Sequence, residues 1–254
     1  MHRAERIVTA IVAAFLLLCP VVAHAQGAGA TGEEPVARPG PGALSPGVVI
    51  VHRRGERSFC SGTMLSGRLL VTALHCVAEI GAEAPYPSPE IRVGFGASTT
   101  DPDLIWRDVS RIILLTEAIP KTVEDLQGQD VVLLELATET EGPAFGIPGQ
   151  LPLPEAGDVL TLIGFGEDRF GVVGTRHAVE VTVTGQTTGG FSYTGGGCLG
   201  DSGGPLLTGD GALIGIASLG TTSLCTPNHQ RIGQALAPFS DAIIDTLLRP
   251  GNLN

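Results

Sequence analysis

Residues 200–205 read Gly-Asp-Ser-Gly-Gly-Pro, which is the most specific string in the chain. A nucleophilic serine needs an exposed hydroxyl and nearby backbone N–H groups that point at the developing oxyanion. Glycines on both sides of Ser202 let the backbone turn tightly and approach a substrate closely. A shorter Gly-x-Ser-Gly string is usually an ordinary serine in a surface turn. The six-residue string predicts a nucleophile at Ser202.

Two stretches upstream carry residue types that activate a serine. Residues 70–76 (LVTALHC) predict a strand that delivers His75 immediately before a half-cystine. Residues 130–134 (DVVLL) place Asp130 where a strand enters the core, and a charge there is costly unless it is paired. A histidine is its obvious partner. Read alone, His75 could instead be a core histidine beside a disulfide, and Asp130 a solvent-facing strand cap.

Short apolar runs alternate with turns along most of the chain. The 254 residues include 36 Gly and 18 Pro, only 16% are charged, and a hydrophobic content of 43% is ample for a core. Many short strands joined by turns are typical of β-barrels or a β-sandwich. The runs expected to form strands are 48–51, 58–64, 68–74, 91–93, 109–115, 130–136, 159–163, 178–184, 205–207 and 213–218.

A proline- and glycine-rich stretch over residues 141–154 predicts a linker between two domains. The N-terminal domain would span 46–146 and carry the histidine and the aspartate. The C-terminal domain would span 147–254 and carry the serine. Apolar residues recur at helical spacing near the end of the chain, which predicts a helix over 240–248.

The N-terminus predicts an export signal. A short basic region precedes an almost unbroken apolar run over 7–22, which ends near Ala23-His24-Ala25, a suitable signal-peptidase site. We expect removal of residues 1–25, secretion to an extracellular or periplasmic location, and no membrane attachment afterwards. A retained anchor is the alternative, although the run is shorter than the ~20 residues of a bilayer-spanning helix. Residues 26–45 are rich in Gly, Ala, Pro and Glu and predict a flexible leader or pro-segment.

Charge and cysteine usage restrict the partners and the redox compartment. With 15 basic and 26 acidic residues the net charge is -11, and the absence of a basic cluster argues against a nucleic-acid partner. Four cysteines follow residue 25, and an even number in an exported chain indicates disulfides. The local pairs Cys60–Cys76 and Cys198–Cys225 are preferred among three pairings. A four-cysteine zinc site would need Cys-x-x-Cys spacing, which the sequence lacks, so no metal is expected.

The order His75, Asp130, Ser202 and the strings around these residues resemble the chymotrypsin/trypsin family of serine proteases over roughly residues 45–248. A short interval between the aspartate and the serine resembles a compact, bacterial-type member. Ala73-Leu74-His75-Cys76 has a leucine where the family usually has alanine. Two further strings resemble family elements, namely the turn after the inter-domain crossover (Gly164-Phe165-Gly166) and the edge that pairs with substrate backbone (Ser218-Leu219-Gly220).

The resemblance implies an all-β fold with two six-stranded antiparallel Greek-key barrels packed face to face and a C-terminal helix. It implies a serine endopeptidase in which Ser202 attacks the peptide carbonyl, His75 takes its proton and Asp130 holds the imidazole. The backbone N–H groups of Gly200 and Ser202 would form the oxyanion hole. The family also bridges the cysteines that match both preferred pairs. We expect polypeptide substrates, a protein inhibitor among the partners, a monomer and no organic cofactor.

Primary specificity would depend on residues around the predicted substrate pocket. Gly196 matches a position at the pocket base where a trypsin-like preference needs an acidic residue, so no such preference is expected. Gly220 should leave the pocket mouth open. Arg231 is expected near the pocket wall, where a cation could select an acidic side chain, or else it is a solvated residue at a strand edge. The preference is left open between small or apolar and acidic side chains.

The means of activation is the feature that departs most from the family. In that family, cleavage before an Ile-Val-Gly-Gly string frees an amine, which pairs with the aspartate that matches Asp201. No such string occurs between residues 26 and 48 of this chain. Asp201 then has another partner, or an unusual cut in the leader frees an amine. The polar surroundings of His52 and His177 predict exposed side chains.

Three competing functions follow from these observations. A proteolytically inactive binding protein of the same fold and an unactivated zymogen are the main alternatives. An esterase with a nucleophile elbow would need a strand–turn–helix context, whereas residues 206–207 continue as a strand.

Overall fold

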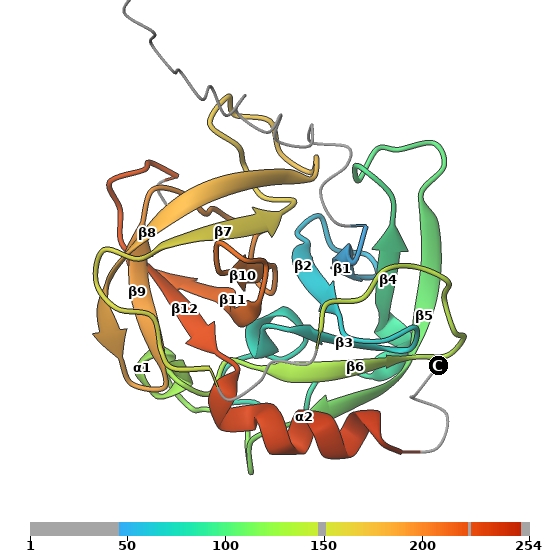
Figure 1. Cartoon of the computed structure of the whole chain (residues 1–254). Coiled ribbons are helices and arrows are strands. Elements are labelled where there is room, and N and C mark those ends of the chain that lie inside the picture. The colour runs from blue at the N-terminus through green and yellow to red at the C-terminus, as the bar shows by residue number, and fades with distance from the viewer. Residues whose placement is uncertain (1–45, 147–150, 223–224, 250–254) are drawn as a thin grey trace, which may run out of the picture. The chain divides into compact units, whose positions relative to one another are not determined.

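The computed structural model describes residues 46–146, 151–222 and 225–249. These residues form two closed six-stranded antiparallel β-barrels followed by a short C-terminal helix (Figure 1). The predicted fold class is therefore confirmed. The predicted signal peptide (1–25) and the predicted leader (26–45) both lie outside the described residues.

The first barrel closes in the order β1-β2-β3-β6-β5-β4, so its third strand pairs with its sixth. A long connection between β5 and β6 carries the short helix α1 (Val123–Leu126), whose N-terminus is capped by the Thr122 side chain. The strands of this barrel are β1 (Val48–Arg53), β2 (Cys60–Met64), β3 (Leu69–Thr72), β4 (Ile91–Phe95), β5 (Ile105–Leu114) and β6 (Val132–Leu136).

The second barrel repeats this connectivity, because its third strand, β9, pairs with its sixth, β12. The sequence did not predict β9 and β12, since neither contains a continuous apolar run. The strands are β7 (Val159–Gly164), β8 (His177–Thr187), β9 (Gly190–Thr194), β10 (Pro205–Leu207), β11 (Leu213–Gly220) and β12 (Arg231–Ala235), followed by the 3₁₀ turn η4 (Ala237–Phe239) and the helix α2 (Ser240–Leu247).

Alternation of side chains along each strand divides the apolar residues into separate cores. Successive residues of a strand point to opposite faces, so β6 sends Leu133 to one core while Val132 and Leu134 join another. One cluster fills the first barrel and a second fills the other barrel. The continuous apolar run that opens after Asp130 is thus explained by a strand that is buried on both faces.

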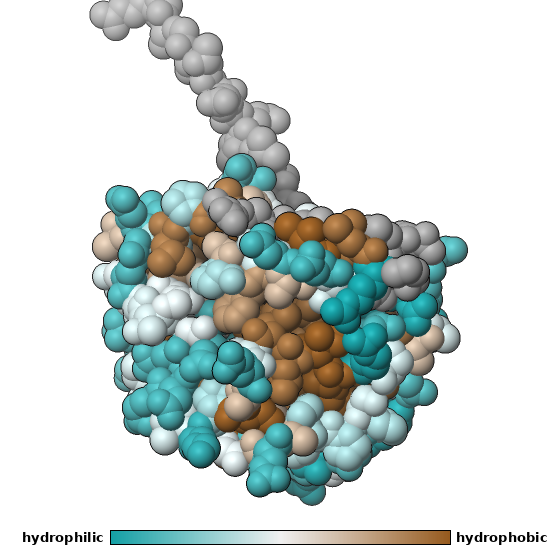
Figure 2. All heavy atoms as spheres, turned by 90° about the horizontal axis from the view of Figure 1, so that it is seen from below, coloured by the Kyte–Doolittle hydropathy of each residue, from teal (hydrophilic) through white to brown (hydrophobic). Residues whose placement is uncertain are grey.

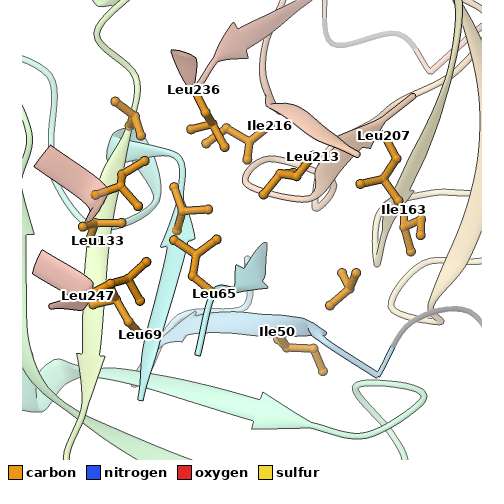
Figure 3. Packing of buried hydrophobic residues seen from close by; sticks show 14 of the residues in the cluster. Ile50, Leu65, Leu69, Leu133, Ile163, Leu207, Leu213, Ile216, Leu236 and Leu247 are labelled. Atoms are coloured by element: carbon orange, nitrogen blue, oxygen red, sulfur yellow. The ribbon is translucent and has the colours of Figure 1, made fainter. Parts of the chain in front are cut away.

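A third apolar cluster joins the two barrels. It contains side chains from β1, β3 and β6 of the first barrel, from β7, β10 and β11 of the second, and from α2. Figure 3 draws 14 residues of this cluster, ten of them labelled, with Leu236 and Leu247 on the C-terminal segment. Because this core holds the barrels together, loops from both can meet at the junction with fixed geometry.

The surface of the molecule adds two observations. On the face seen from below Figure 1, hydrophobic side chains gather near the middle and polar ones surround them (Figure 2). Within the described ranges, every helix is too short or too polar to cross a lipid bilayer.

Candidate active site

Asp130 lies at the junction of the barrels, just before β6, and its side chain is fully buried. Its backbone N–H donates to Oε1 of Gln234 on β12 at 3.1 Å. Its Oδ1 accepts a hydrogen bond from the backbone N–H of His75 at 3.0 Å, and Oδ2 accepts one from the hydroxyl of Ser218 at 2.5 Å. Elements of both barrels therefore fix the position of this carboxylate.

His75 lies on the 3₁₀ turn η2 (Leu74–Cys76), which follows β3, and its Nδ1 is 2.8 Å from Oδ2 of Asp130. A carboxylate can only accept, so Nδ1 carries the hydrogen and the lone pair of the neutral ring lies on Nε2. The side chain of His75 is 26% exposed, which leaves that edge reachable from solvent. The predicted partnership between His75 and Asp130 is present in the structure.

The pKa values of this pair shift in opposite directions. Burial by itself lowers the pKa of His75, but the negative charge of Asp130 and the hydrogen bond to it outweigh burial and raise it above 6.5. Burial by itself raises the pKa of Asp130, yet the charge of His75 and the hydrogen bonds from His75 and Ser218 outweigh it and lower the pKa below 3.8. The geometry therefore favours an ionised aspartate beside an imidazole that accepts a proton readily.

Ser202 lies in the turn before β10 and is linked to this pair through Ser218. Its Oγ donates to the carbonyl of Ser218 at 3.4 Å, and its own carbonyl accepts from the backbone N–H of Ser61 at 2.8 Å. Ser218 thus contacts Ser202 through its backbone and Asp130 through its side chain. Sequence reasoning had assigned Ser218 only to the substrate edge, and its second contact depends on where β11 lies relative to β6.

The turn that carries Ser202 is held by the first barrel. The hydroxyl of Ser61 donates to the carbonyl of Gly200 at 2.8 Å, and Oγ1 of Thr63 donates to the carbonyl of Gly203 at 3.0 Å. Gly200 has a φ of +101°, a conformation that favours glycine. Among the described residues, the backbone N–H groups of Gly200 and Ser202 donate no hydrogen bond, so both remain available to an oxyanion.

Asp201 lies between Gly200 and Ser202, and it is buried, with 1% of the residue exposed. Its Oδ1 accepts from the backbone N–H of Gly166 at 2.8 Å and its Oδ2 from that of Cys198 at 2.9 Å. Nε2 of His177 lies 3.7 Å from Oδ1. Burial raises the pKa of Asp201, and the charge of His177 and the two backbone hydrogen bonds oppose that rise only in part.

The prediction that His177 is exposed is wrong, because its side chain is only 14% exposed. It opens β8 directly opposite Gly164 on β7, and Gly164 and Gly166 have no Cβ atoms that would overlap the Asp201 carboxylate. His52 is half-buried rather than exposed, and its ring lies near Trp106. A polar sequence context did not indicate that either ring packs against a neighbouring element.

A small pocket of about 60 Å³ adjoins Ser202. Three of the predicted substrate-binding positions on β11, together with Arg231, line it. Gly196 does not line it, whereas the next residue, Gly197, does. A Cβ at Gly196 would instead meet the side chain of Val179 on β8. The β11 positions are Ser218, Leu219 and Gly220.

Arg231 is a buried cation in the pocket wall and not a solvated strand-edge residue. It is 5% exposed and lies opposite Tyr193 and Gly220 in the sheet. Its Nε donates to the carbonyl of Gly197 and its Nη1 to that of Thr222, each at 2.9 Å. These two bonds fix the guanidinium beside the pocket.

The predicted disulfides Cys60–Cys76 and Cys198–Cys225 are confirmed, with Cα–Cα distances of 6.1 and 5.2 Å in the usual range. Two clusters of residue types that bind metals include these cysteines, one with His75 and one with Glu167. Sulfurs that are bonded to each other cannot act as thiolate ligands. The cysteines therefore stabilise the loops around the site by cross-linking them.

The chain belongs to the Trypsin family, whose model matches residues 37–243. It is 28% identical to phenoloxidase-activating factor 1 of Holotrichia diomphalia over 60% of this chain and 51% of the relative, so it spans about half the length of that protein. It is 30% identical to trypsin of Phaedon cochleariae over 73% of this chain and 77% of the relative. Human heparin binding protein shares the fold, with a TM-score of 0.66 and 21% identity over 82% of this chain and 94% of that one.

Proposed function

We propose that the protein is a secreted serine endopeptidase that hydrolyses peptide bonds through an acyl-enzyme. The observation that carries the proposal is the link from Ser202 through Ser218 to the buried Asp130, whose carboxylate lies 2.8 Å from Nδ1 of His75. Membership in the Trypsin family supports the same reaction. The predicted signal peptide and the two disulfides support secretion.

In the proposed reaction, Ser202 attacks the peptide carbonyl while Nε2 of His75 takes the hydroxyl proton. The hydroxyl first rotates from the Ser218 carbonyl toward His75, a change of one side-chain torsion. Asp130 holds the imidazole and stabilises the imidazolium. The oxyanion accepts hydrogen bonds from the N–H groups of Gly200 and Ser202, and each such donor contributes about 10²–10³ in rate. His75 then protonates the leaving amine, and water hydrolyses the acyl ester.

Mass spectrometry of the purified exported chain after treatment with a fluorophosphonate tests the proposal. We expect one adduct, on Ser202, and none in the Ser202→Ala variant or on Ser192, which is buried in β9. An adduct requires a working base and oxyanion hole but no knowledge of the substrate. A folded chain that forms no adduct would refute an active protease and support an inactive binding protein or an unactivated zymogen.

The same site also supports a preference for an acidic residue before the cleaved bond. The buried Arg231 guanidinium lines the pocket beside Ser202, and a charge-assisted hydrogen bond to a carboxylate contributes roughly 1.5–3 kcal/mol. This preference is favoured over the small or apolar one because Arg231 brings a positive charge to the wall of the pocket beside Ser202.

A panel of peptide substrates that differ only at this residue tests the preference. We expect the ratio of kcat/KM for Asp over Ala to fall roughly ten- to hundredfold in Arg231→Gln. Arg231→Lys, which retains the charge, should keep part of the preference. An enzyme that cleaves after alanine faster than after aspartate would show that the pocket selects by size.

A further inference from the structure

We propose that His177 is a positioning residue whose imidazole holds the Asp201 carboxylate and, through it, the turn that carries Gly200 and Ser202. This inference rests on the proposed protease function. It identifies an internal partner for Asp201, one of the two alternatives that the sequence left open.

The surroundings of Asp201 leave little freedom for its side chain. The carboxylate is 1% exposed, and backbone N–H groups of Gly166 and Cys198 bind one oxygen each. His177 is the side chain that approaches Oδ1, from the start of β8, at 3.7 Å. It reaches this position because β8 pairs with β7 directly opposite Gly164, whose missing Cβ leaves room for the carboxylate.

The other nitrogen of His177 determines where its hydrogen lies. Nδ1 is 3.3 Å from the carbonyl of Thr175, which can only accept, so Nδ1 carries a hydrogen. Nε2 then faces Oδ1 of Asp201 either with a second hydrogen or with a lone pair. The 3.7 Å between Nε2 and Oδ1 is the separation of an ion pair and not of a hydrogen bond, so a protonated His177 acts on Asp201 through its charge.

The turn around Ser202 is organised about Asp201. The backbone N–H of Asp201 donates to the carbonyl of Cys198 at 3.0 Å, and its carbonyl accepts from Gly204 at 2.9 Å. Since Oδ2 also binds the N–H of Cys198, the side chain fixes the start of the turn and the backbone fixes its end. Loss of the Asp201 anchor would release the peptide groups on both sides of it, which include the N–H groups of Gly200 and Ser202.

Other ionisable groups among the described residues interact electrostatically with this pair. Asp168 lies in the loop after β7, and its pKa is lowered mainly by the backbone N–H of Val172, with a smaller contribution from His177. Arg231 on β12 opposes the rise in the pKa of Asp201. Tyr193 on β9 has its pKa raised by burial first and by the charge of Asp201 second, so it stays neutral.

Burial raises the pKa of Asp201, and the charge of His177 is the largest of the effects that oppose this rise. His177 therefore stabilises the ionised carboxylate, and its loss should raise the pKa of Asp201 further. The stability linked to the raised pKa is present at low pH and is lost as the pH rises through the pKa of folded Asp201.

The rate constant for labelling of Ser202 by a small fluorophosphonate near neutral pH tests this role. His177→Phe keeps a ring but cannot donate, and we expect at least about a tenfold loss of the rate, less than removal of an oxyanion donor would cause. His177→Gln keeps an N–H group and should recover most of the rate. His52→Phe, a histidine on β1 of the other barrel, is the matched control and should leave the rate unchanged.

The outcomes separate this inference from the proposed function. An unlabelled wild-type protein would refute the protease proposal, whereas a labelled wild type with an unchanged rate in His177→Phe would overturn only the role of His177. If His177→Phe does not fold, NMR of the ¹⁵N-labelled protein and its His177→Asn variant decides, because the shorter side chain places its amide farther from Asp201. We expect the backbone amide signals of Gly166 and Cys198 to shift between the two proteins. Unchanged signals overturn the inference.

Discussion

Ser218 donates its hydroxyl hydrogen to Oδ2 of Asp130 at 2.5 Å, while its carbonyl accepts from Oγ of Ser202 at 3.4 Å. One residue of β11 in the second barrel therefore contacts the carboxylate that the first barrel contributes. Asp130 is also held by the second barrel through its backbone bond to Gln234. The proposed catalytic groups thus keep their geometry only while the two barrels stay packed together.

Substitution of Ser218 by alanine removes the hydroxyl and leaves the carbonyl in place. Asp130 loses one donor, so its pKa should rise and its interaction with His75 should weaken. We expect kcat/KM to fall roughly tenfold with KM nearly unchanged, because a hydrogen bond to a charged group contributes about 1.5–3 kcal/mol, part of which water replaces. Steady-state kinetics on a peptide substrate measure this. Ser192→Ala, in the middle of β9, is the control and should keep full activity.

Removal of the Asp130 charge should have a larger effect. Asp130→Asn would present an amide to Nδ1 of His75 and stabilise the wrong tautomer. We expect kcat to fall by about 10⁴, the magnitude known for this change in the same catalytic class. Binding of a competitive peptide inhibitor should persist, since Asp130 is fully buried and contacts no substrate. A variant that retains more than about a tenth of the wild-type kcat would contradict the assigned role.

The raised pKa of His75 predicts where activity is lost on the acid side. Only the neutral imidazole accepts the Ser202 proton, so kcat/KM should fall as the pH drops through a midpoint above 6.5. The same ion pair contributes stability that is fully present below 6.5 and is lost as the pH rises through the pKa of folded His75. A pH profile of kcat/KM checks the midpoint, and a value at or below 6.5 would argue against the His75–Asp130 interaction as described.

Two glycines with similar backbone angles allow a matched test of crowding behind Ser202. Gly203 (φ +84°) and Gly211 (φ +87°) both adopt a conformation that strains other residues by about 1–2 kcal/mol. A Cβ at Gly203 would also overlap Ser61 and Thr72 of the first barrel, whereas a Cβ at Gly211 would meet nothing within 4 Å. We expect Gly203→Ala to lower the free energy of unfolding by clearly more than Gly211→Ala, and to reduce activity as well. Denaturant titrations measure both free energies. If the two variants lose the same free energy of unfolding, the residues at the barrel junction move aside for the added Cβ at little cost.

Local patterns were sufficient for much of the fold. The apolar run after Asp130 indicated a strand, and the structure has β6 (Val132–Leu136) there, beginning two residues later than expected. The 3₁₀ turn η2 replaces the end of the strand expected over 68–74. Strands β9 and β12 were missed because neither contains a continuous apolar run, and their pairing with each other joins segments distant in the sequence.

The sequence by itself singled out the proposed catalytic residues, because Ser202, His75 and Asp130 each lie in a string whose residue types that chemistry requires. It also determined the two disulfides, whose loops are short. Only the tertiary structure decided the partners of Asp201 and the burial of Arg231. The physical reason is that His177 on β8 and Arg231 on β12 contact the loop between β9 and β10, and these segments are brought together only when the barrel closes.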